Sequence, residues 1–464
     1  MKPLTIQQIR EAVDGKILAE LPSPLAMVHA VCTDTRHMQQ SSLFVPIRGE
    51  HHDAHRFIRA AADGGAICAL VDHVPETKPE NVVLIQVADT RKALGRLARH
   101  VRQTMRSKVV AVAGSNGKTS TKHLIDAALN GRLRGSISPK SYNNDIGVPL
   151  TIFPADPKQD YLVLEMGTNH HGEILPLAKM ASPDIAVITN CGAEHLEGLD
   201  DLTGVRRENA MILAGLNPRG LLVVNGDDRE LLDAVGAYSG RQMTFGFDSR
   251  NDLFPTDIVC TQRGTEFRIN GDGPAVFVPL LGRHTACNAL AAIAVARALA
   301  VPDETIFDGL SRARGPDMRL ELSHIGQITL LNDAYNANPN SMRAAIETLA
   351  NLPTDGRRIA VLGEMRELGA YSEEYHREIG SFVARTRKID LLLCVEAAGE
   401  WIADAAMGAG LASSSIRRCA DSAAAASAIG ELLLPGDLIL LKASRGVRLE
   451  AVANALAARA TARP

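Results

Sequence analysis

The stretch VVAVAGSNGKTSTKHL at residues 109–124 predicts a buried strand, a turn bracketed by glycines and then a helix. Gly114 and Gly117 allow the backbone to turn sharply and to approach an anion closely. The amides of the turn then point inward at the positive end of the helix, an arrangement suited to phosphate. Lys118 can reach the phosphates of a nucleotide, and the Thr119 hydroxyl can bind Mg²⁺. A glycine turn with a solvated lysine is the simpler alternative, but the flanking strand and helix favour a phosphate site.

This loop is shorter than the usual phosphate-binding loop of nucleotide hydrolases. The usual spacing places a glycine five residues before the glycine that precedes the lysine, and here that position is Val112. The short spacing by itself leaves open which kind of ATP site this is.

Length and strand pattern predict an α/β protein of three domains. A chain of 464 residues exceeds what one hydrophobic core normally serves. Short strands and helical patterns alternate over the first hundred residues. A new series of apolar strands then predicts a parallel sheet covered on both faces, and a third strand–helix series follows the linker RARGPDM. We place the domains at residues 1–105, 106–315 and 316–464.

Composition and charge exclude several classes of protein. The apolar fraction of 46% and the charged fraction of 22% are ordinary for a globular protein. A net charge of −3 without a basic tract argues against nucleic-acid binding. Because the N-terminal segment is amphipathic and carries acidic residues, and no apolar run reaches membrane-spanning length, we expect a cytoplasmic protein without membrane insertion. The seven scattered cysteines form no CxxC pair, which argues against a disulfide framework or a cysteine zinc site.

Polar residues follow neighbouring apolar strands at the points where these strands end. Glu165 ends the strand YLVLE, and His195 lies in the loop after the strand IAVITN. Ligand sites in parallel sheets gather at the carboxyl ends of strands, so Glu165 and His195, with Thr119, are candidate magnesium ligands. A solvated glutamate or a structural histidine is the ordinary alternative for either residue alone. Asn143 and Asn144 are turn-forming residues that gain interest from their place after the phosphate-loop helix.

The order of motifs along nearly the whole chain resembles that of the ATP-dependent Mur ligases. Their short loop G-x-N-G-K-T/S accounts for the spacing at residues 109–124. Further similar stretches are NNDIGVPLT, LEMGTN, HLEG, GRHTACNALAA, NDAYNANPNSMRAAI, LGEMRELGAYSEEYHREIG and LKASRGVRLE, and TDTRHMQQSSLFVPIRGEHHDAHRFI resembles a uridine-nucleotide-binding segment. The resemblance implies a small UDP-binding domain, a central ATP-binding domain with a parallel sheet, and a Rossmann-like C-terminal domain.

The same resemblance implies an activity. YNANP and LGEMRELG are similar to the family member that adds D-alanyl-D-alanine to UDP-N-acetylmuramoyl-tripeptide, using ATP and Mg²⁺ and an acyl-phosphate intermediate, in peptidoglycan precursor synthesis. A paralogue that joins a different amine to a different carboxylate is the alternative, and a nucleotide-binding regulator without turnover is a third hypothesis. We expect a monomer whose partners are small molecules. The sequence leaves open whether the third peptide residue is lysine or diaminopimelate.

The resemblance also implies the site residues, position by position. Catalysis would rest on Lys118, Glu165 and His195, and Mg²⁺ on Thr119, Glu165 and His195. The nucleotide would be bound by Gly114, Asn116, Gly117, Lys118, Thr119, Ser120, Asn288, Arg319, Asp333 and Asn336. Substrates would be bound by Thr35 and Arg36 near the UDP moiety, by Asn143 and Asn144, and by Lys442, Ser444 and Arg445 near the incoming dipeptide or the acyl phosphate.

Some positions depart from the family pattern. Asn209 stands where the family usually has a lysine that, once carbamylated, helps to hold a second Mg²⁺, and no lysine lies between Lys179 and Lys388 to replace it. We expect Asn209 to face an open cleft, so that Asn209→Lys is tolerated. Four smaller departures from the family pattern are Met211, Thr285, Met318 and Glu364. All these departures are consistent either with drift within the subfamily or with a paralogue that has other substrates.

Overall fold

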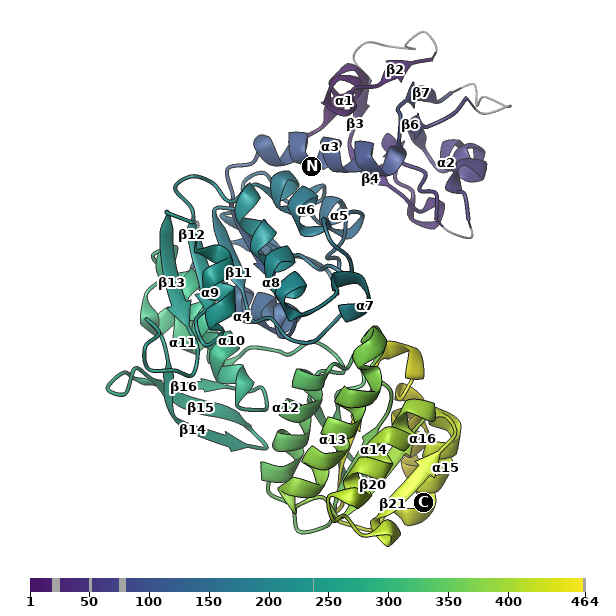
Figure 1. Ribbon diagram of the computed structural model, residues 1–464. Coiled ribbons are helices and arrows are strands. Elements are labelled where there is room, and N and C mark those ends of the chain that lie inside the picture. Colours follow the sequence, from purple (N-terminus) through teal and green to yellow (C-terminus); the bar gives the residue numbers. More distant parts are fainter. Residues whose placement is uncertain (19–25, 50–51, 75–80, 237, 462–464) are drawn as a thin grey trace.

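The computed structural model describes residues 1–18, 26–49, 52–74, 81–236 and 238–461, which form three α/β regions along the molecule (Figure 1). The predicted α/β class, with three domains each built on a largely parallel sheet, is confirmed. Residues 50 and 51 of the predicted uridine-nucleotide segment lie outside the described residues. Within the described ranges, none of the helices combines the length and the apolar character needed to span a membrane.

The N-terminal region contains a five-stranded sheet in the order β2-β7-β6-β5-β4, in which β2 is antiparallel to its neighbour and the other pairs are parallel. A short antiparallel pair, β1 and β3, lies beside it. The strands are β1 (Leu4–Thr5), β2 (Lys16–Ile17), β3 (Met27–Val28), β4 (Ala30–Cys32), β5 (Ser42–Phe44), β6 (Ala66–Val71) and β7 (Val83–Gln86). The helices are α1 (Ile6–Val13), α2 (Ile58–Asp63) and α3 (Thr90–Gln103), with the 3₁₀ turns η1 (Thr35–His37) and η2 (Ala54–Phe57).

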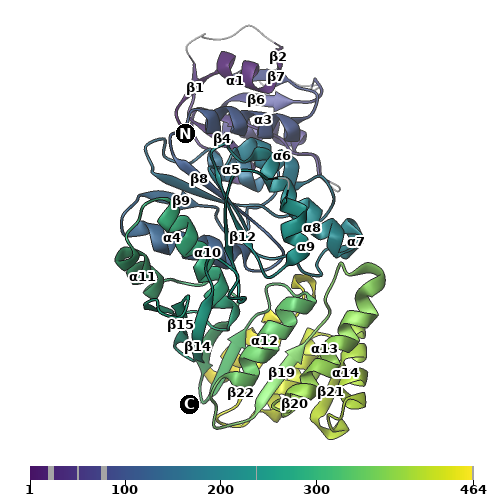
Figure 2. The ribbon, with the colours of Figure 1, turned by 60° about the vertical axis from the view of Figure 1, so that its left-hand side comes forward.

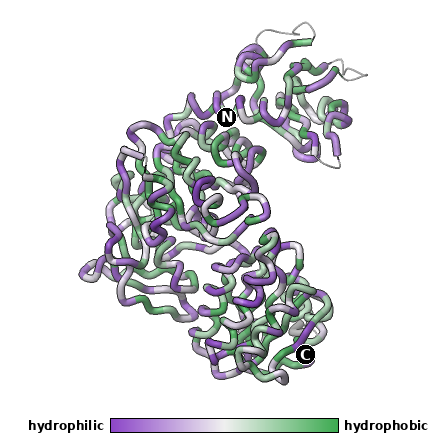
Figure 3. The backbone as a smooth tube through the Cα atoms, viewed as in Figure 1, coloured by the Kyte–Doolittle hydropathy of each residue, from purple (hydrophilic) through white to green (hydrophobic). Residues whose placement is uncertain are grey.

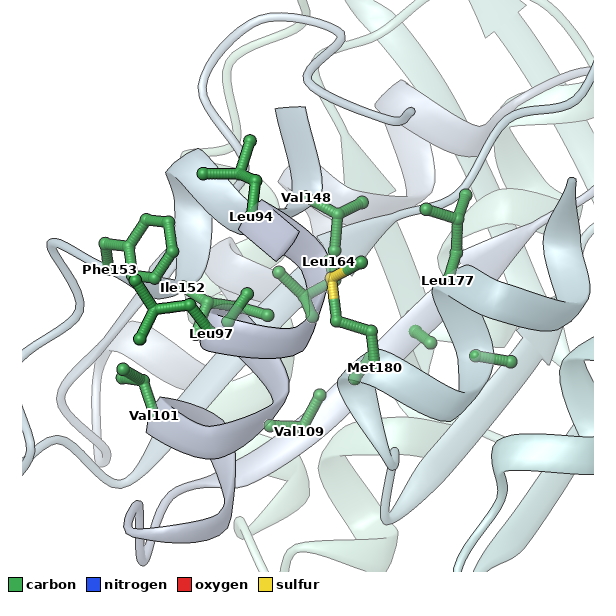
Figure 4. Packing of buried hydrophobic residues seen from close by; sticks show 14 of the residues in the cluster. Leu94, Leu97, Val101, Val109, Val148, Ile152, Phe153, Leu164, Leu177 and Met180 are labelled. Carbon is green, nitrogen blue, oxygen red and sulfur yellow. The ribbon is translucent and has the colours of Figure 1, made fainter. Parts of the chain in front are cut away.

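Helix α3 connects this small sheet to the central region. Its apolar residues Leu94, Leu97 and Val101 recur at helical spacing and form one buried face. That face packs on α5 (Gly147–Ile152) and α6 (Ile174–Ala181) of the central region, so both regions share one hydrophobic core (Figure 4). Asp89 caps the helix by accepting a hydrogen bond from the amide of Lys92, which satisfies one of its free N–H groups.

The central region is built on six parallel strands in the order β13-β12-β11-β8-β10-β9. Alternate residues of β8 face opposite layers: Val110 and Val112 pack toward α4 (Lys118–Asn130) and α10 (His284–Ala298), whereas Val109 and Ala111 pack toward α5 and α6. The ribbon shows helices on both sides of the sheet (Figure 2), and the tube through this region includes hydrophobic segments (Figure 3). Both faces are covered, which is why the strands are almost continuously apolar. The strands are β8 (Lys108–Ala113), β9 (Gly135–Ile137), β10 (Tyr161–Glu165), β11 (Ile185–Ile188), β12 (Leu221–Asn225) and β13 (Arg241–Phe245).

The helices of the central region and an antiparallel insert complete it. An insert between β13 and α10 forms the three-stranded sheet β14-β15-β16. Its strands are β14 (Pro255–Thr261), β15 (Gly264–Ile269) and β16 (Ala275–Val278). The helices are α4 (Lys118–Asn130), α5 (Gly147–Ile152), α6 (Ile174–Ala181), α7 (Leu196–Leu199), α8 (Leu202–Ala210), η3 (Met211–Gly215), α9 (Arg229–Val235), α10 (His284–Ala298) and α11 (Asp303–Ser311).

The C-terminal region has a second six-stranded sheet in the order β17-β18-β22-β19-β20-β21, in which β17 alone is antiparallel to its neighbour. Helices α12, α13 and α14 cover one face, and α15 and α16 cover the other. The strands are β17 (Glu321–Ile325), β18 (Ile328–Asn332), β19 (Arg358–Leu362), β20 (Leu391–Val395), β21 (Ile416–Cys419) and β22 (Leu438–Lys442). The helices are α12 (Pro339–Asn351), η4 (Gly369–Tyr371), α13 (Ser372–Thr386), α14 (Ala397–Gly408), η5 (Ser413–Ser415), α15 (Ser422–Leu432), η6 (Arg445–Val447) and α16 (Glu450–Thr461).

Candidate nucleotide-binding site

The predicted phosphate loop joins β8 to α4 at the centre of the six-stranded sheet. Strand β8 pairs with β10 on one side and with β11 on the other. The chain places β9 and β10 on the first side and then β11, β12 and β13 on the second, so the loop lies at the point where strand order reverses. Gly114 and Gly117 both have positive φ, at 126° and 81°. A Cβ on Gly117 would lie 2.6 Å from the Oδ1 atom of Asn288. The turn therefore requires glycine both for its dihedral angles and for its close neighbours.

Gly114→Ala should destabilise the protein by about 2–5 kcal/mol, because the substitution adds backbone strain to a steric clash. The new Cβ would lie 2.2 Å from Oγ1 of Thr189 and 2.9 Å from the carbonyl oxygen of Asn190. Gly172→Ala is the matched control, since Gly172 also has positive φ (84°) but its Cβ would have nothing within 4 Å. Urea unfolding of both variants measures the difference. Equal losses of stability would show that the neighbours of Gly114 impose no constraint.

Lys118 and Thr119 begin α4 and face the same cleft. The ammonium group of Lys118 donates to the carbonyl oxygens of Gly114 and Ser115, and it lies 3.5 Å from Oε1 of Glu194. It thus folds back over the loop whose amides would hold phosphate. An ammonium group at this place can neutralise a phosphate bound in the cleft.

Glu165 ends β10 and is only 1% exposed, yet one edge of its carboxylate borders the cleft. Its Oε1 atom accepts hydrogen bonds from the Thr119 hydroxyl at 3.2 Å and from Nδ2 of Asn143 at 3.3 Å. Its Oε2 atom forms an ion pair with Nζ of Lys122 at 3.0 Å. The Lys122 ammonium group therefore holds Oε2 of the carboxylate, and the other oxygen atom, Oε1, faces the phosphate loop.

Lys122 is a residue of this site that the sequence reasoning missed. Its side chain is fully buried, and its ammonium group also donates to the carbonyl oxygen of Lys140 at 2.5 Å. Burial lowers the pKa of Lys122, and the neighbouring charge of Glu165 opposes this shift. A signal was present in the sequence, because Lys122 follows Lys118 by four residues and so lies on the same face of α4.

The oxygen atoms around the phosphate loop fit a magnesium ion. Mg²⁺ takes oxygen ligands at about 2.0–2.1 Å in an octahedron, which places adjacent ligands roughly 2.9 Å apart. Oγ1 of Thr119 and Oε1 of Glu165 are 3.2 Å apart, close to that spacing. A second carboxylate, that of Glu194, borders the same cleft. Thr119 and Glu165 therefore suit a hard cation, and Glu194 is a further candidate ligand that the sequence did not indicate.

The third predicted metal ligand, His195, has another partner in the structure. His195 has φ of 51° at the start of α7, and its Nδ1 atom pairs with Oε2 of Glu367 from the C-terminal region. The amide of Glu197 also donates to the carbonyl oxygen of Glu367 at 3.2 Å. The hydrogen bond from His195 lowers the pKa of Glu367. His195 does border the cleft, but its observed interaction links two regions of the chain.

The cleft is closed by the C-terminal region. Nδ2 of Asn338 donates to Oδ1 of Asn116 at 2.8 Å, and the Tyr335 hydroxyl donates to Oγ of Ser141 at 2.7 Å. Asn338 also caps α12, so one side chain both begins a helix and contacts the phosphate loop. The resulting cleft of about 450 Å³ brings together most of the predicted site residues, namely Asn116, Gly117, Lys118, Thr119, Ser120, Asn143, Glu165, His195, Asn288, Arg319, Asp333, Asn336 and Lys442.

Lys442 lies in a different environment from Ser444 and Arg445, the two residues that were predicted with it to lie near the dipeptide or the acyl phosphate. Its ammonium group is buried, binds Oδ2 of Asp333 at 2.5 Å and donates to the carbonyl oxygen of Asn336 at 3.1 Å. Burial lowers the pKa of Lys442, against the effect of Asp333. The Ser444 hydroxyl is instead buried against the backbone, and Arg445 pairs with Glu450 at 3.4 Å. Neither Ser444 nor Arg445 borders the cleft.

Three more predicted substrate contacts lie outside this cleft. Oδ1 of Asn144 accepts from the amides of Ile146 and Gly147, so this residue shapes the turn, in contrast to Asn143. Thr35 and Arg36 lie in η1 of the N-terminal region, where the Arg36 side chain is 82% exposed and pairs with Asp34.

The expectation that Asn209 faces an open cleft is wrong. Asn209 is 1% exposed near the end of α8, and its Nδ2 atom donates to the carbonyl oxygen of Val205 at 2.9 Å. The neighbouring Glu208 accepts hydrogen bonds from the amides of Gly172 and Ile174, which hold its carboxylate in place. Asn209→Lys would bury an ammonium group in place of a satisfied amide, so tolerance is no longer expected.

The fold and the site define a class of protein: a three-domain α/β nucleotide-binding protein whose phosphate loop is closed over by a Rossmann-like domain. Comparison with known protein families supports this class over most of the chain. Residues 27–102 match the Mur ligase family catalytic domain, residues 112–296 the Mur ligase middle domain, and residues 318–445 the glutamate ligase domain of Mur ligases. The chain belongs to the Mur ligase family, and the predicted assignment to the ATP-dependent ligases is confirmed.

Individual relatives cover nearly the full length. The UDP-N-acetylmuramoyl-tripeptide–D-alanyl-D-alanine ligase of Bacillus subtilis is 37% identical, with 97% of this chain and 98% of that protein aligned. The Escherichia coli ligase of the same name is 36% identical over 98% of this chain and 99% of its own. The crystal structure of MurF from Acinetobacter baumannii superposes with a TM-score of 0.89 at 30% identity and 99% coverage of both chains. The crystal structure of MurF from Thermotoga maritima in complex with ADP superposes with a TM-score of 0.83 at 27% identity. The match covers 94% of this chain and 99% of that one.

Proposed function

We propose that this protein uses ATP to join D-alanyl-D-alanine to the terminal carboxylate of UDP-N-acetylmuramoyl-tripeptide, in the cytoplasmic synthesis of peptidoglycan precursors. The observation that carries the proposal is the convergence of a phosphate loop, Thr119 and Glu165 on one cleft that the C-terminal region closes. The full-length similarity to ligases of that name supports the choice of substrates.

ATP would bind with its phosphates against the loop from Gly114 to Ser120. Lys118 would neutralise the phosphates, and Asn288 and Asn338 would border the nucleotide from α10 and α12. Arg319, which stacks over the ring of Tyr335 at 4.3 Å, adds a positive charge from the C-terminal region. The Arg319 guanidinium therefore depends on domain closure for its place beside the nucleotide.

The chemistry needs positioning and neutralisation of crowded anions more than a protein nucleophile. The tripeptide carboxylate attacks the γ-phosphate of ATP, which releases ADP and forms an acyl phosphate. The amine of D-alanyl-D-alanine then attacks that carbonyl carbon, and loss of phosphate leaves the amide. Thr119 and Glu165 would hold Mg²⁺, which supplies charge neutralisation at the transferred phosphate. Lys442, buried beside Asp333, is placed at the same cleft for the second step.

The remaining parts of the proposal concern the chain as a whole. Residues 1–105 would form the UDP-binding domain, residues 106–315 the ATP-binding domain and residues 316–464 the domain that receives the dipeptide. The exposed Arg36 guanidinium, with Thr35 beside it, is a suitable contact for a diphosphate. We propose that the protein acts as a monomer with small-molecule partners.

Phosphate release from ATP should depend on the presence of both UDP-N-acetylmuramoyl-tripeptide and D-alanyl-D-alanine. The measurement is a coupled phosphate assay with Mg²⁺, run with either substrate omitted and with tripeptides that contain lysine or diaminopimelate. Release with the tripeptide and only a different amine would favour the paralogue over the proposed ligase. Nucleotide binding without any substrate-dependent release would favour a regulator that has lost turnover.

A further inference from the structure

A group of metal-binding side chains lies in the N-terminal region, among residues that do not border the nucleotide cleft. His55, Asp72 and His73 place one ligand atom each within 4.8 Å of one another. His55 lies in η2, whereas Asp72 and His73 directly follow the buried strand β6. The carboxyl end of a parallel strand and a short 3₁₀ turn thus bring together residues that are 17 positions apart.

His55 is already oriented as a metal-binding histidine would be. Asp53 caps η2 and lies 2.6 Å from Nδ1 of His55, so the Nδ1–H group donates to the carboxylate. The lone pair of Nε2 then points toward Asp72, whose amide donates to it at 3.4 Å. A carboxylate on the far nitrogen fixes the tautomer and the ring orientation of histidines that bind metals. His55 is buried, so its ring cannot turn freely.

The distances in this group are close to those of a tetrahedral site. Zinc binds histidine nitrogen and carboxylate oxygen at about 2.0–2.2 Å, which places neighbouring ligand atoms roughly 3.3 Å apart. Nε2 of His55 is 3.3 Å from Oδ1 of Asp72. Nδ1 of His73 lies 2.5 Å from the same oxygen atom. This is the distance of a hydrogen bond, and it is shorter than the spacing between two zinc ligands. The His73 side chain is 51% exposed and can rotate by the small amount required.

The charged side chains around this group carry an excess of negative charge, which favours a bound cation. Asp53 and Asp72 supply two negative charges, and among the described residues Arg48 is the permanent cation that contacts them, at 3.1 Å and 3.5 Å. With both histidines neutral, the cluster keeps one net negative charge. A cation bound between Nε2 of His55 and Oδ1 of Asp72, which are 3.3 Å apart, would offset this negative charge.

We propose that His55, Asp72 and His73 form a zinc-binding site in the N-terminal region. Two imidazole nitrogens with one carboxylate favour zinc over Mg²⁺ or Ca²⁺, which take oxygen ligands. Three protein ligands would leave a fourth position for water or an external ligand. This site is distinct from the proposed magnesium ligands at the phosphate loop. It lies in the proposed UDP-binding domain, where His55 belongs to the stretch that resembles a uridine-nucleotide-binding segment.

The test is equilibrium dialysis of the full chain, freed of metal with a chelator, against Zn²⁺ in buffer with excess Mg²⁺. Magnesium occupies the oxygen ligands of the nucleotide cleft without competing for imidazole. We expect one zinc ion per chain and at least a tenfold weaker affinity in Asp72→Asn and in His73→Gln. His52→Gln is the matched control, because His52 is an exposed histidine near the group that contributes no ligand. Cobalt substitution should give the visible absorption of a tetrahedral site.

Three outcomes would overturn the proposal. The first is the absence of zinc binding to the native chain under these conditions. The second is zinc binding that persists unchanged in His73→Gln, a substitution at a half-exposed position where folding is not at risk. The third is equal loss of affinity in His52→Gln, which would indicate diffuse binding to surface histidines. Circular dichroism of each variant separates loss of a ligand from loss of the fold.

Discussion

Lys118→Ala should lower the rate of substrate-dependent phosphate release by about a hundred- to a thousand-fold while the protein stays folded. Lys118 supplies the ammonium group nearest to the loop amides, and removal of one preorganised group that stabilises developing charge typically costs this much. The partners of its ammonium group are two loop carbonyls and, at 3.5 Å, Glu194. Because these partners keep other contacts, such as that of Asn338 with Glu194, we expect only a small loss of stability.

The measurement for Lys118→Ala is the steady-state rate with both substrates, together with the affinity for ATP in the presence of Mg²⁺. Lys158→Ala is the control, since Lys158 is an exposed lysine of the same region. Far-UV circular dichroism and the thermal midpoint report on the fold. Product formation within tenfold of the native rate would show that the phosphate-loop assignment is wrong.

Lys122→Met should destabilise the protein by about 3–5 kcal/mol, because it leaves the carboxylate of Glu165 buried without its counter-charge. Glu165 would keep only the neutral hydrogen bonds from Thr119 and Asn143, and the carbonyl oxygen of Lys140 would lose its donor. Replacement of both partners by apolar residues is far less costly than removal of one. The double variant Lys122→Met with Glu165→Leu should therefore regain most of the stability and remain inactive, since it lacks the proposed magnesium ligand.

Urea unfolding of the two single variants and the double variant measures this coupling. Lys108→Met provides the control, because Lys108 forms a surface ion pair with Asp184 at 3.3 Å in the same region, and such pairs contribute about 0–1 kcal/mol. A loss in Lys122→Met no larger than that of the control would mean that water or rearrangement replaces the buried cation. The site would then have no rigid support behind Glu165.

Much of the fold followed from local patterns. The apolar runs of β8, β10, β11 and β12 predicted a parallel sheet because each strand is buried on both faces. Glu165 could be placed at the edge of the cleft because parallel strands end on the same side. The pair of asparagines shows where such reasoning stops. Asn143 reaches Glu165 whereas Asn144 forms the turn, and adjacent identical residues carry no signal that separates them.

The sequence by itself determined the strand, the glycine turn and the helix at residues 109–124, because positive φ at Gly114 and apolar periodicity are properties of a few neighbouring residues. Only the tertiary structure decided that His195 pairs with Glu367, 172 positions away, and that Asn209 is buried. These contacts depend on how whole domains and helices are oriented. Orientation results from packing summed over many distant side chains, which no short stretch of sequence records.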